Sequence, residues 1–104
     1  MKMTNITANA LLNLKEEPAS LTVHGSIITY RADDKVAVVK ANPQGFVEEV
    51  LVLDLTVLEG SGPMKGTPKP FFYVNDDPNA STFSKVTIRY GEGQEITIDV
   101  ESVG

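Results

Sequence analysis

Oxygen-bearing side chains around Asp77 form the best candidate metal-binding group in the sequence. Asp77 and Asn79 alternate as the first ligands of an EF-hand calcium loop do, and Asp76 stands beside them. The loop pattern then breaks, because Thr82 stands where the loop needs glycine and Ile88 where it needs a bidentate glutamate. The competing interpretation is an Asx turn, in which Asp and Asn side chains accept hydrogen bonds from nearby N–H groups. We retain Asp76, Asp77 and Asn79 as a candidate calcium site, with the Asx turn as the structural alternative.

Two further patterns resemble phosphate-binding or catalytic chemistry but lack parts of it. Lys65-Gly66-Thr67 has the residue types of a phosphate loop in the wrong order, and a proline-rich stretch follows where a helix should begin. His24 is the single histidine of the chain. A two-histidine metal site is therefore excluded, and no serine triad with an orienting partner is evident. Neither pattern predicts an active site.

An acidic row near the end of the chain has the residue types of acid–base catalysis. Glu95, Asp99 and Glu101 fall on one face of a predicted strand, and paired carboxylates can transfer protons. The neighbouring strand carries Lys85 and Arg89, which can neutralise the row. We interpret these residues as a solvated, charge-paired face, and we expect no enzyme activity and no cofactor.

Composition limits the partners of the chain. Its 104 residues are enough for a single β domain spanning 1–104, and the absence of cysteine excludes disulfides and thiolate zinc sites. The net charge of −5 argues against nucleic acid and anionic membranes, since both attract basic surfaces. No apolar leader or membrane-length run is present, so we expect a cytoplasmic location.

The elements that must position these residues are strands. Branched and aromatic residues recur with a period of two between turn signals, which is typical of β-structure. The seven predicted strands are Ile6–Glu16, Ser20–Arg31, Val36–Ala41, Phe46–Leu58, Phe71–Asn75, Lys85–Tyr90 and Glu95–Val100. A helix is the alternative for Ile6–Glu16, because alanine and leucine favour helices. The pattern predicts an all-β fold, an antiparallel β-sandwich, with a small closed β-barrel as the alternative.

Two irregularities are predicted within this layout. The apolar residues of Ser20–Arg31 change parity near Gly25-Ser26, which indicates a bulge or bend there. The stretch Gly60–Pro70 contains three glycines and three prolines. Such a composition is typical of an irregular, mobile loop.

Two hairpins have a register that the turn residues predict. Asn42-Pro43-Gln44-Gly45 reads as a three-residue turn that pairs Asn42 with Phe46. This register sets valines side by side: Val38 opposite Val50, and Val36 opposite Val52. Gly91-Glu92-Gly93, with Gly93 left-handed, pairs Tyr90 with Gln94 in the same way. The pairs that follow are Arg89 with Glu95, Ile88 with Ile96, Thr87 with Thr97, and Lys85 with Asp99.

The first of these registers predicts an interaction surface. It gathers valines on a face that a sandwich would leave in water, and a large exposed apolar patch is typical of a binding site. Aromatic side chains at Phe71–Tyr73 offer a second one. The candidate interaction residues are Val36, Val38, Phe46, Val50, Val52 and Phe72. We therefore expect a non-catalytic protein-interaction module that self-associates as a homodimer or larger oligomer. Another protein is a further candidate partner. The alternatives are a carrier of a small apolar ligand and an enzyme of unknown class.

Overall fold

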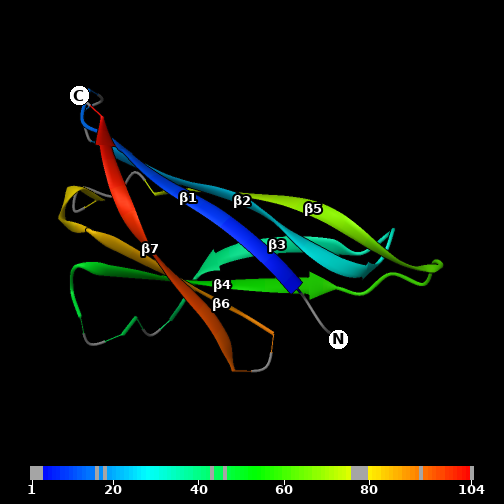
Figure 1. Ribbon diagram of the computed structural model, residues 1–104. Helices are drawn as coiled ribbons and strands as arrows, with labels where there is room; N and C mark the ends of the chain where they lie inside the picture. The colour runs from blue at the N-terminus through cyan, green and yellow to red at the C-terminus, as the bar shows by residue number, and fades with distance from the viewer. Residues whose placement is uncertain are drawn as a thin grey trace.

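The part of the chain that the structure, a computed structural model, describes forms seven strands in one sheet (Figure 1). The structure describes residues 4–15, 17, 19–42, 44–45, 47–75, 80–91 and 93–103. The strands are β1 (Thr4–Asn13), β2 (Ser20–Arg31), β3 (Lys35–Lys40), β4 (Val50–Leu58), β5 (Met64–Asn75), β6 (Lys85–Tyr90) and β7 (Gln94–Val103). Their order in the sheet is β3-β4-β6-β7-β1-β2-β5. The prediction of an all-β fold is confirmed, and residues 6–13 of the predicted first strand belong to β1 rather than to a helix.

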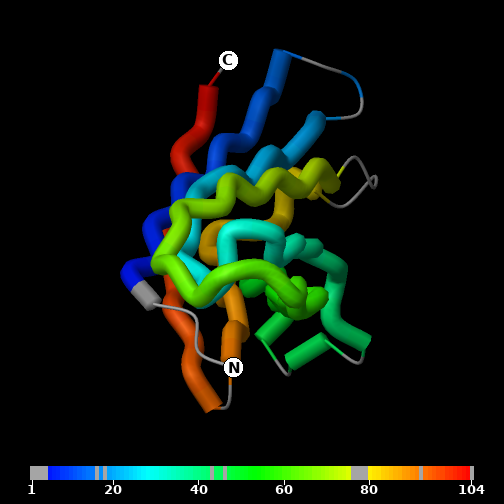
Figure 2. The backbone as a smooth tube through the Cα atoms, turned by 90° about the vertical axis from the view of Figure 1, so that its right-hand side faces the viewer, coloured from blue at the N-terminus to red at the C-terminus, as the bar shows by residue number. Residues whose placement is uncertain are grey.

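The sheet folds back on itself, so that two layers face each other. β5, β2 and β1 form one layer, and β3, β4 and β6 form the other. β7 belongs to both layers, because its first part pairs with β6 and its last part with β1. The two edge strands, β3 and β5, contact each other, as Figure 2 shows. The sheet is therefore a nearly closed barrel, and it is mixed, since β4–β6 and β1–β7 are parallel.

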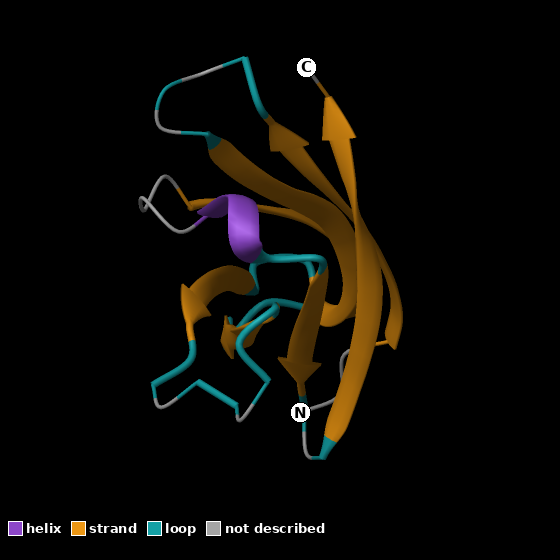
Figure 3. Cartoon of the chain, turned by 90° about the vertical axis from the view of Figure 1, so that its left-hand side faces the viewer, coloured by secondary structure: helices purple, strands orange, loops and turns teal. Residues whose placement is uncertain are grey.

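Side chains fill the space between the two layers. Alternate residues of each strand point inward, as the period of two requires. The core is formed by Ala10, Leu12, Leu21, Val23, Ile27, Leu51, Leu53, Leu55, Phe71, Ala80, Phe83, Val86 and Ile88. A short 3-10 turn, η1 (Ala80–Thr82), contributes to this core and contacts β2 (Figure 3). In the described part of the chain, none of the helical structure has the length and apolarity needed to cross a membrane.

The predicted change of face in β2 is wrong. Buried residues keep one parity from Leu21 to Thr29. The register shifts lie elsewhere, between Thr4 and Thr7 of β1 and, in the pairing of β2 with β5, between Thr29 and Arg31. Gly25 has a different role. A Cβ atom at Gly25 would lie 1.9 Å from the carbonyl oxygen of Thr7 and 2.8 Å from Cζ of Phe71. Glycine is therefore required because β1 and the Phe71 ring approach the backbone of β2 closely.

The predicted register of the central hairpin is also wrong. Lys40 pairs with Leu53, Val38 with Leu55, and Val36 with Val57. Since the shift from the predicted register is an odd number of residues, β3 turns its opposite face to the core. Val36 and Val38 now pack against the core, while Val50 and Val52 lie on the other face of β4.

A glutamine side chain explains this register. The amide N–H of Ala41 donates to the carbonyl oxygen of Val52 at 3.0 Å, so the ladder continues one step beyond Lys40. At that step, Nε2 of Gln44 donates to the carbonyl oxygens of Ala41 and Val52, at 2.6 and 2.9 Å, and its Oε1 accepts from the N–H of Val52 at 2.8 Å. The Gln44 amide thus takes the place of the tight turn, and β4 begins at Val50 rather than at Phe46.

The stretch Gly60–Pro70 is not an irregular loop throughout, because β5 already begins at Met64. Pro68 and Pro70 lie within β5, opposite Ile28 and Ser26 of β2. Proline lacks the N–H that a central strand donates to its neighbours, but β5 is an edge strand with a neighbour on one side only. The edge position therefore allows a strand to contain prolines, which composition alone had assigned to a loop.

The C-terminal hairpin has the predicted register. Tyr90 pairs with Gln94, and the remaining pairs are Arg89–Glu95, Ile88–Ile96, Thr87–Thr97 and Lys85–Asp99. Gly93 is left-handed, with φ +72°. This prediction is confirmed.

Candidate interaction surfaces

Two aspartates fasten the β2–β3 turn to the loop that precedes β5. Asp33 accepts hydrogen bonds from the N–H groups of Ser61 and Gly62, and Asp34 accepts from Gly60 at 2.8 Å. Arg31 closes the contact from the same turn, since its Nη1 donates to the carbonyl oxygen of Gly62 at 2.5 Å.

The hydrogen bonds to these carboxylates change their ionisation. The N–H groups of Ser61 and Gly62 lower the pKa of Asp33, and the N–H of Gly60 lowers the pKa of Asp34. Both carboxylates are therefore held ionised as acceptors for backbone groups. Their role is to fix two loops, and neither is poised as an acid or base.

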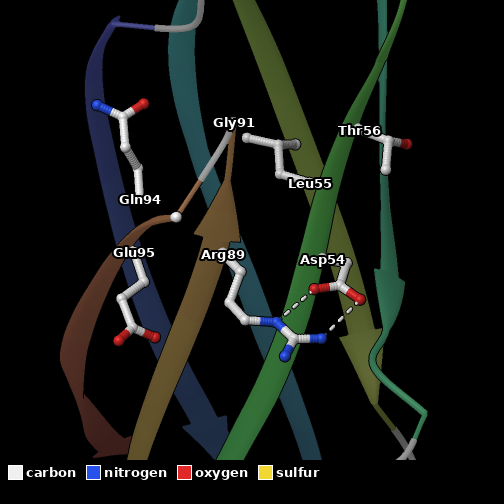
Figure 4. A pocket seen from close by; sticks show the side chains of 8 residues that line it. Asp54, Leu55, Thr56, Arg89, Gly91, Gln94 and Glu95 are labelled. Atoms are coloured by element: carbon white, nitrogen blue, oxygen red, sulfur yellow. Dashed lines mark hydrogen bonds and ion pairs between the residues drawn. The ribbon is translucent and has the colours of Figure 1, made fainter.

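An ion pair lies on the outer face of β4 and β6 (Figure 4). Arg89 donates through Nε to Oδ1 of Asp54 at 2.6 Å and through Nη2 to Oδ2 at 2.9 Å. These hydrogen bonds, with the charge of Asp54 and then of Glu95, raise the pKa of Arg89. The pair lines an open hollow of about 500 Å³ together with Thr56, Gln94 and neighbouring residues.

A second hollow of about 550 Å³ adjoins the first and is more apolar. Gly45 and Val47, from the segment between β3 and β4, line this hollow together with Val50 and Val52 of β4. Gln44 and Glu95 stand at its rim. Two of the predicted interaction residues, Val50 and Val52, are therefore on the surface of a groove.

The acidic row of β7 is charge-paired in part. Nζ of Lys85 lies 2.5 Å from Oδ1 of Asp99, as expected from their register. The hydroxyls of Thr87 and Thr97 form a hydrogen bond of 2.9 Å. Arg89 makes its hydrogen bonds to Asp54 on β4 rather than to Glu95, although Glu95 lies opposite it on β7.

Among the described residues, the most exposed aromatic side chain lies on the other layer of the barrel. Phe72 of β5 is 65% exposed, and Val74, two residues along on the same face, is 46% exposed. The cross-strand neighbour of Phe72 is His24, and a row from Val74 leads through Thr22 to Leu11. Leu11 is exposed as well. Apolar side chains thus reach from the edge strand across the outer face of this layer.

The predicted interaction residues do not converge on one surface. Val36 and Val38 face the core, Val50 and Val52 line the groove beside β4, and Phe72 lies on the outer face of β5. Phe46, Asp76, Asp77 and Asn79 lie outside the described residues. Within the described part of the chain, no cluster of three or more acidic, histidine or cysteine side chains could hold a metal ion.

Sequence reasoning missed Val74 and Leu11. The alternation of Phe72 with Val74 carried a signal for the first of them, because two apolar residues of one parity must share a face. Leu11 was visible as the residue that broke the alternation of β1. Comparisons of the chain with protein-family models, with curated proteins and with solved structures gave no match.

Proposed function

We propose that the protein is a non-catalytic interaction module whose first partner is a second copy of itself. The observation that carries the proposal is the exposure of Phe72 and Val74, side by side on a strand at the edge of the sheet. Exposed apolar side chains that adjoin one another mark interaction sites, whereas isolated ones are ordinary. The proposal keeps the cytoplasmic location expected from the sequence.

The interior of the barrel favours this proposal over a ligand carrier. Carriers hold an apolar molecule in a cavity lined by inward-facing side chains. Here large inward-facing side chains are fully buried against one another, among them Leu21, Ile27, Leu53 and Ile88. The two hollows beside β4 are open to solvent and lie outside the barrel.

Sedimentation velocity from micromolar to millimolar protein tests the proposal. We expect a reversible dimer, and we expect Phe72→Ser to raise its Kd by about tenfold or more, because the aromatic surface is no longer removed from water. Leu58→Ser is the matched control, since Leu58 is also apolar and is 72% exposed but lies at the end of β4. A wild-type chain that remains monomeric at millimolar concentration would contradict the proposed function.

A further inference from the structure

We propose that two copies join edge to edge along β5, antiparallel, with Phe72 of one copy opposite Val74 of the other. The inference rests on the proposed self-association and specifies its geometry. Each sheet would then continue into the next through main-chain hydrogen bonds, a recurrent mode of recognition at exposed sheet edges.

The prolines of β5 show which backbone groups face outward. In a strand, the N–H and C=O groups of one residue point to one side, and those of the next residue to the other. Pro68 and Pro70 have no N–H to donate, so their side of the strand is expected to point away from β2. Phe72 and Val74 share their parity, and their N–H and C=O groups therefore point to the free edge.

A hydrogen bond at the far side of the layer gives the same answer independently. The N–H of Leu14 donates to the carbonyl oxygen of Val103 at 2.7 Å, so the even-numbered residues at this end of β1 face β7. Its odd-numbered residues must then face β2, in pairs such as Leu11 with Thr22. Odd-numbered residues of β2 consequently face β5, in pairs such as Val23 with Tyr73. This again leaves Phe72 and Val74 facing outward.

The outward backbone groups of Phe72 and Val74 are available for hydrogen bonds with another strand. Among the described residues, no backbone hydrogen bond joins β3 to β5, and β5 pairs in register with β2 alone. Unpaired groups on an edge strand are a template for a further strand. Prolines protect the first half of β5, at Pro68 and Pro70, whereas Phe71–Asn75 contains none.

The same prolines distinguish two candidate registers. A two-fold axis at Tyr73 places Phe72 opposite Val74 of the second copy, and Val74 opposite its Phe72. Each of the two pairs exchanges both hydrogen bonds, because all four residues have an N–H. A two-fold axis at Phe72 would instead set Val74 opposite Pro70, which has no N–H for the Val74 carbonyl. The first register also joins an aromatic to a β-branched side chain, a favourable cross-strand pair.

Cysteine cross-linking tests the register, since the chain has no cysteine of its own. Opposed residues that share hydrogen bonds have Cα atoms about 5.5 Å apart, within the range of a disulfide. We expect a mixture of Phe72→Cys and Val74→Cys chains to form mixed disulfide dimers under mild oxidation, and neither variant alone to match that yield. A higher yield for Phe72→Cys alone, or equal yields throughout, would overturn the proposed register.

Proline substitution tests the use of the edge itself. Val74→Pro removes an N–H that points away from β2, so the fold should survive, as judged by circular dichroism and thermal unfolding. We expect the Kd of the dimer to rise by about tenfold or more, because each dimer loses two hydrogen bonds. The control Val74→Thr keeps the N–H and the β-branched shape, and should change the Kd less.

The outcomes separate the two proposals. A folded Val74→Pro chain that dimerises like the wild type would overturn edge pairing and leave self-association in place. A wild-type chain that stays monomeric would overturn both, and an extended peptide would then be the remaining occupant of the edge.

Discussion

Arg89 reaches along the sheet to Asp54 and holds both of its carboxylate oxygens, at 2.6 and 2.9 Å, while Glu95 stands opposite Arg89 on β7 without a hydrogen bond to it. Two acidic side chains therefore flank one guanidinium, and only one is bonded. We expect Asp54→Asn to lower the free energy of unfolding more than Glu95→Gln does. Because the pair is exposed, the difference should shrink as salt is added. Urea unfolding at low and high ionic strength measures it, and equal effects of the two variants would contradict this ordering.

Acid should weaken the fastening between the β2–β3 turn and the loop before β5. The pKa values of Asp33 and Asp34 are lowered in the folded chain. Their contribution is therefore complete above the ordinary aspartate pKa of about 4, and it is lost as pH falls through the lower folded values.

Denaturant unfolding between neutral pH and pH about 2 measures that loss. The variant Asp34→Ala should be less stable at neutral pH and should lose less stability in acid than the wild type. An unchanged acid dependence in Asp34→Ala would show that other carboxylates dominate acid unfolding.

Gln44 should stabilise the central hairpin more than an ordinary loop residue does. Gln44→Ala leaves the N–H of Val52 and the carbonyl oxygen of Ala41 without the partner that the amide provides. We expect a loss of roughly 1–3 kcal/mol in the free energy of unfolding. Gln94→Ala, at the exposed first residue of β7, is the control and should cost about 0.5 kcal/mol or less.

Gly25 should tolerate no side chain. In Gly25→Ala the new Cβ would meet the backbone of β1 at 1.9 Å, and two strands must separate to admit it. We expect a loss of about 3 kcal/mol or more. Gly66→Ala is the control, because its Cβ would have only Ile28 nearby, at 3.6 Å. Thermal unfolding of the two variants compares them, and similar melting temperatures would show that β1 can move aside.

The two hairpins show where sequence reasoning succeeds. The register of β6 and β7 follows from local residues, since two glycines adopt left-handed conformations and opposite charges, Lys85 and Asp99, meet across the strands. The register of β3 and β4 depends on a side chain eight residues from its partner, Gln44 to Val52. No turn rule includes such a contact, so the predicted tight turn was wrong.

The start of β5 depended on contacts still more distant in sequence. Asp33 and Asp34 accept hydrogen bonds from the backbone of Gly62 and Gly60, and these bonds attach the loop before β5 to the β2–β3 turn. The candidate interaction residues were predictable only where their position depends on a single strand. Phe72 was found from its strand alone, whereas the position of Val36 and Val38 depended on the register and changed face with it.

The sharing of β7 between the two layers has a consequence for synthesis of the chain. Without β7, the strand order separates into β3-β4-β6 and β1-β2-β5, and no ladder between described residues joins the two groups. A nascent chain that has not yet reached residues 94–103 can form hairpins but cannot complete the sheet. Closure must therefore await the emergence of β7 from the ribosome, and until then the edges of β6 and β1 that β7 will occupy are open to other chains.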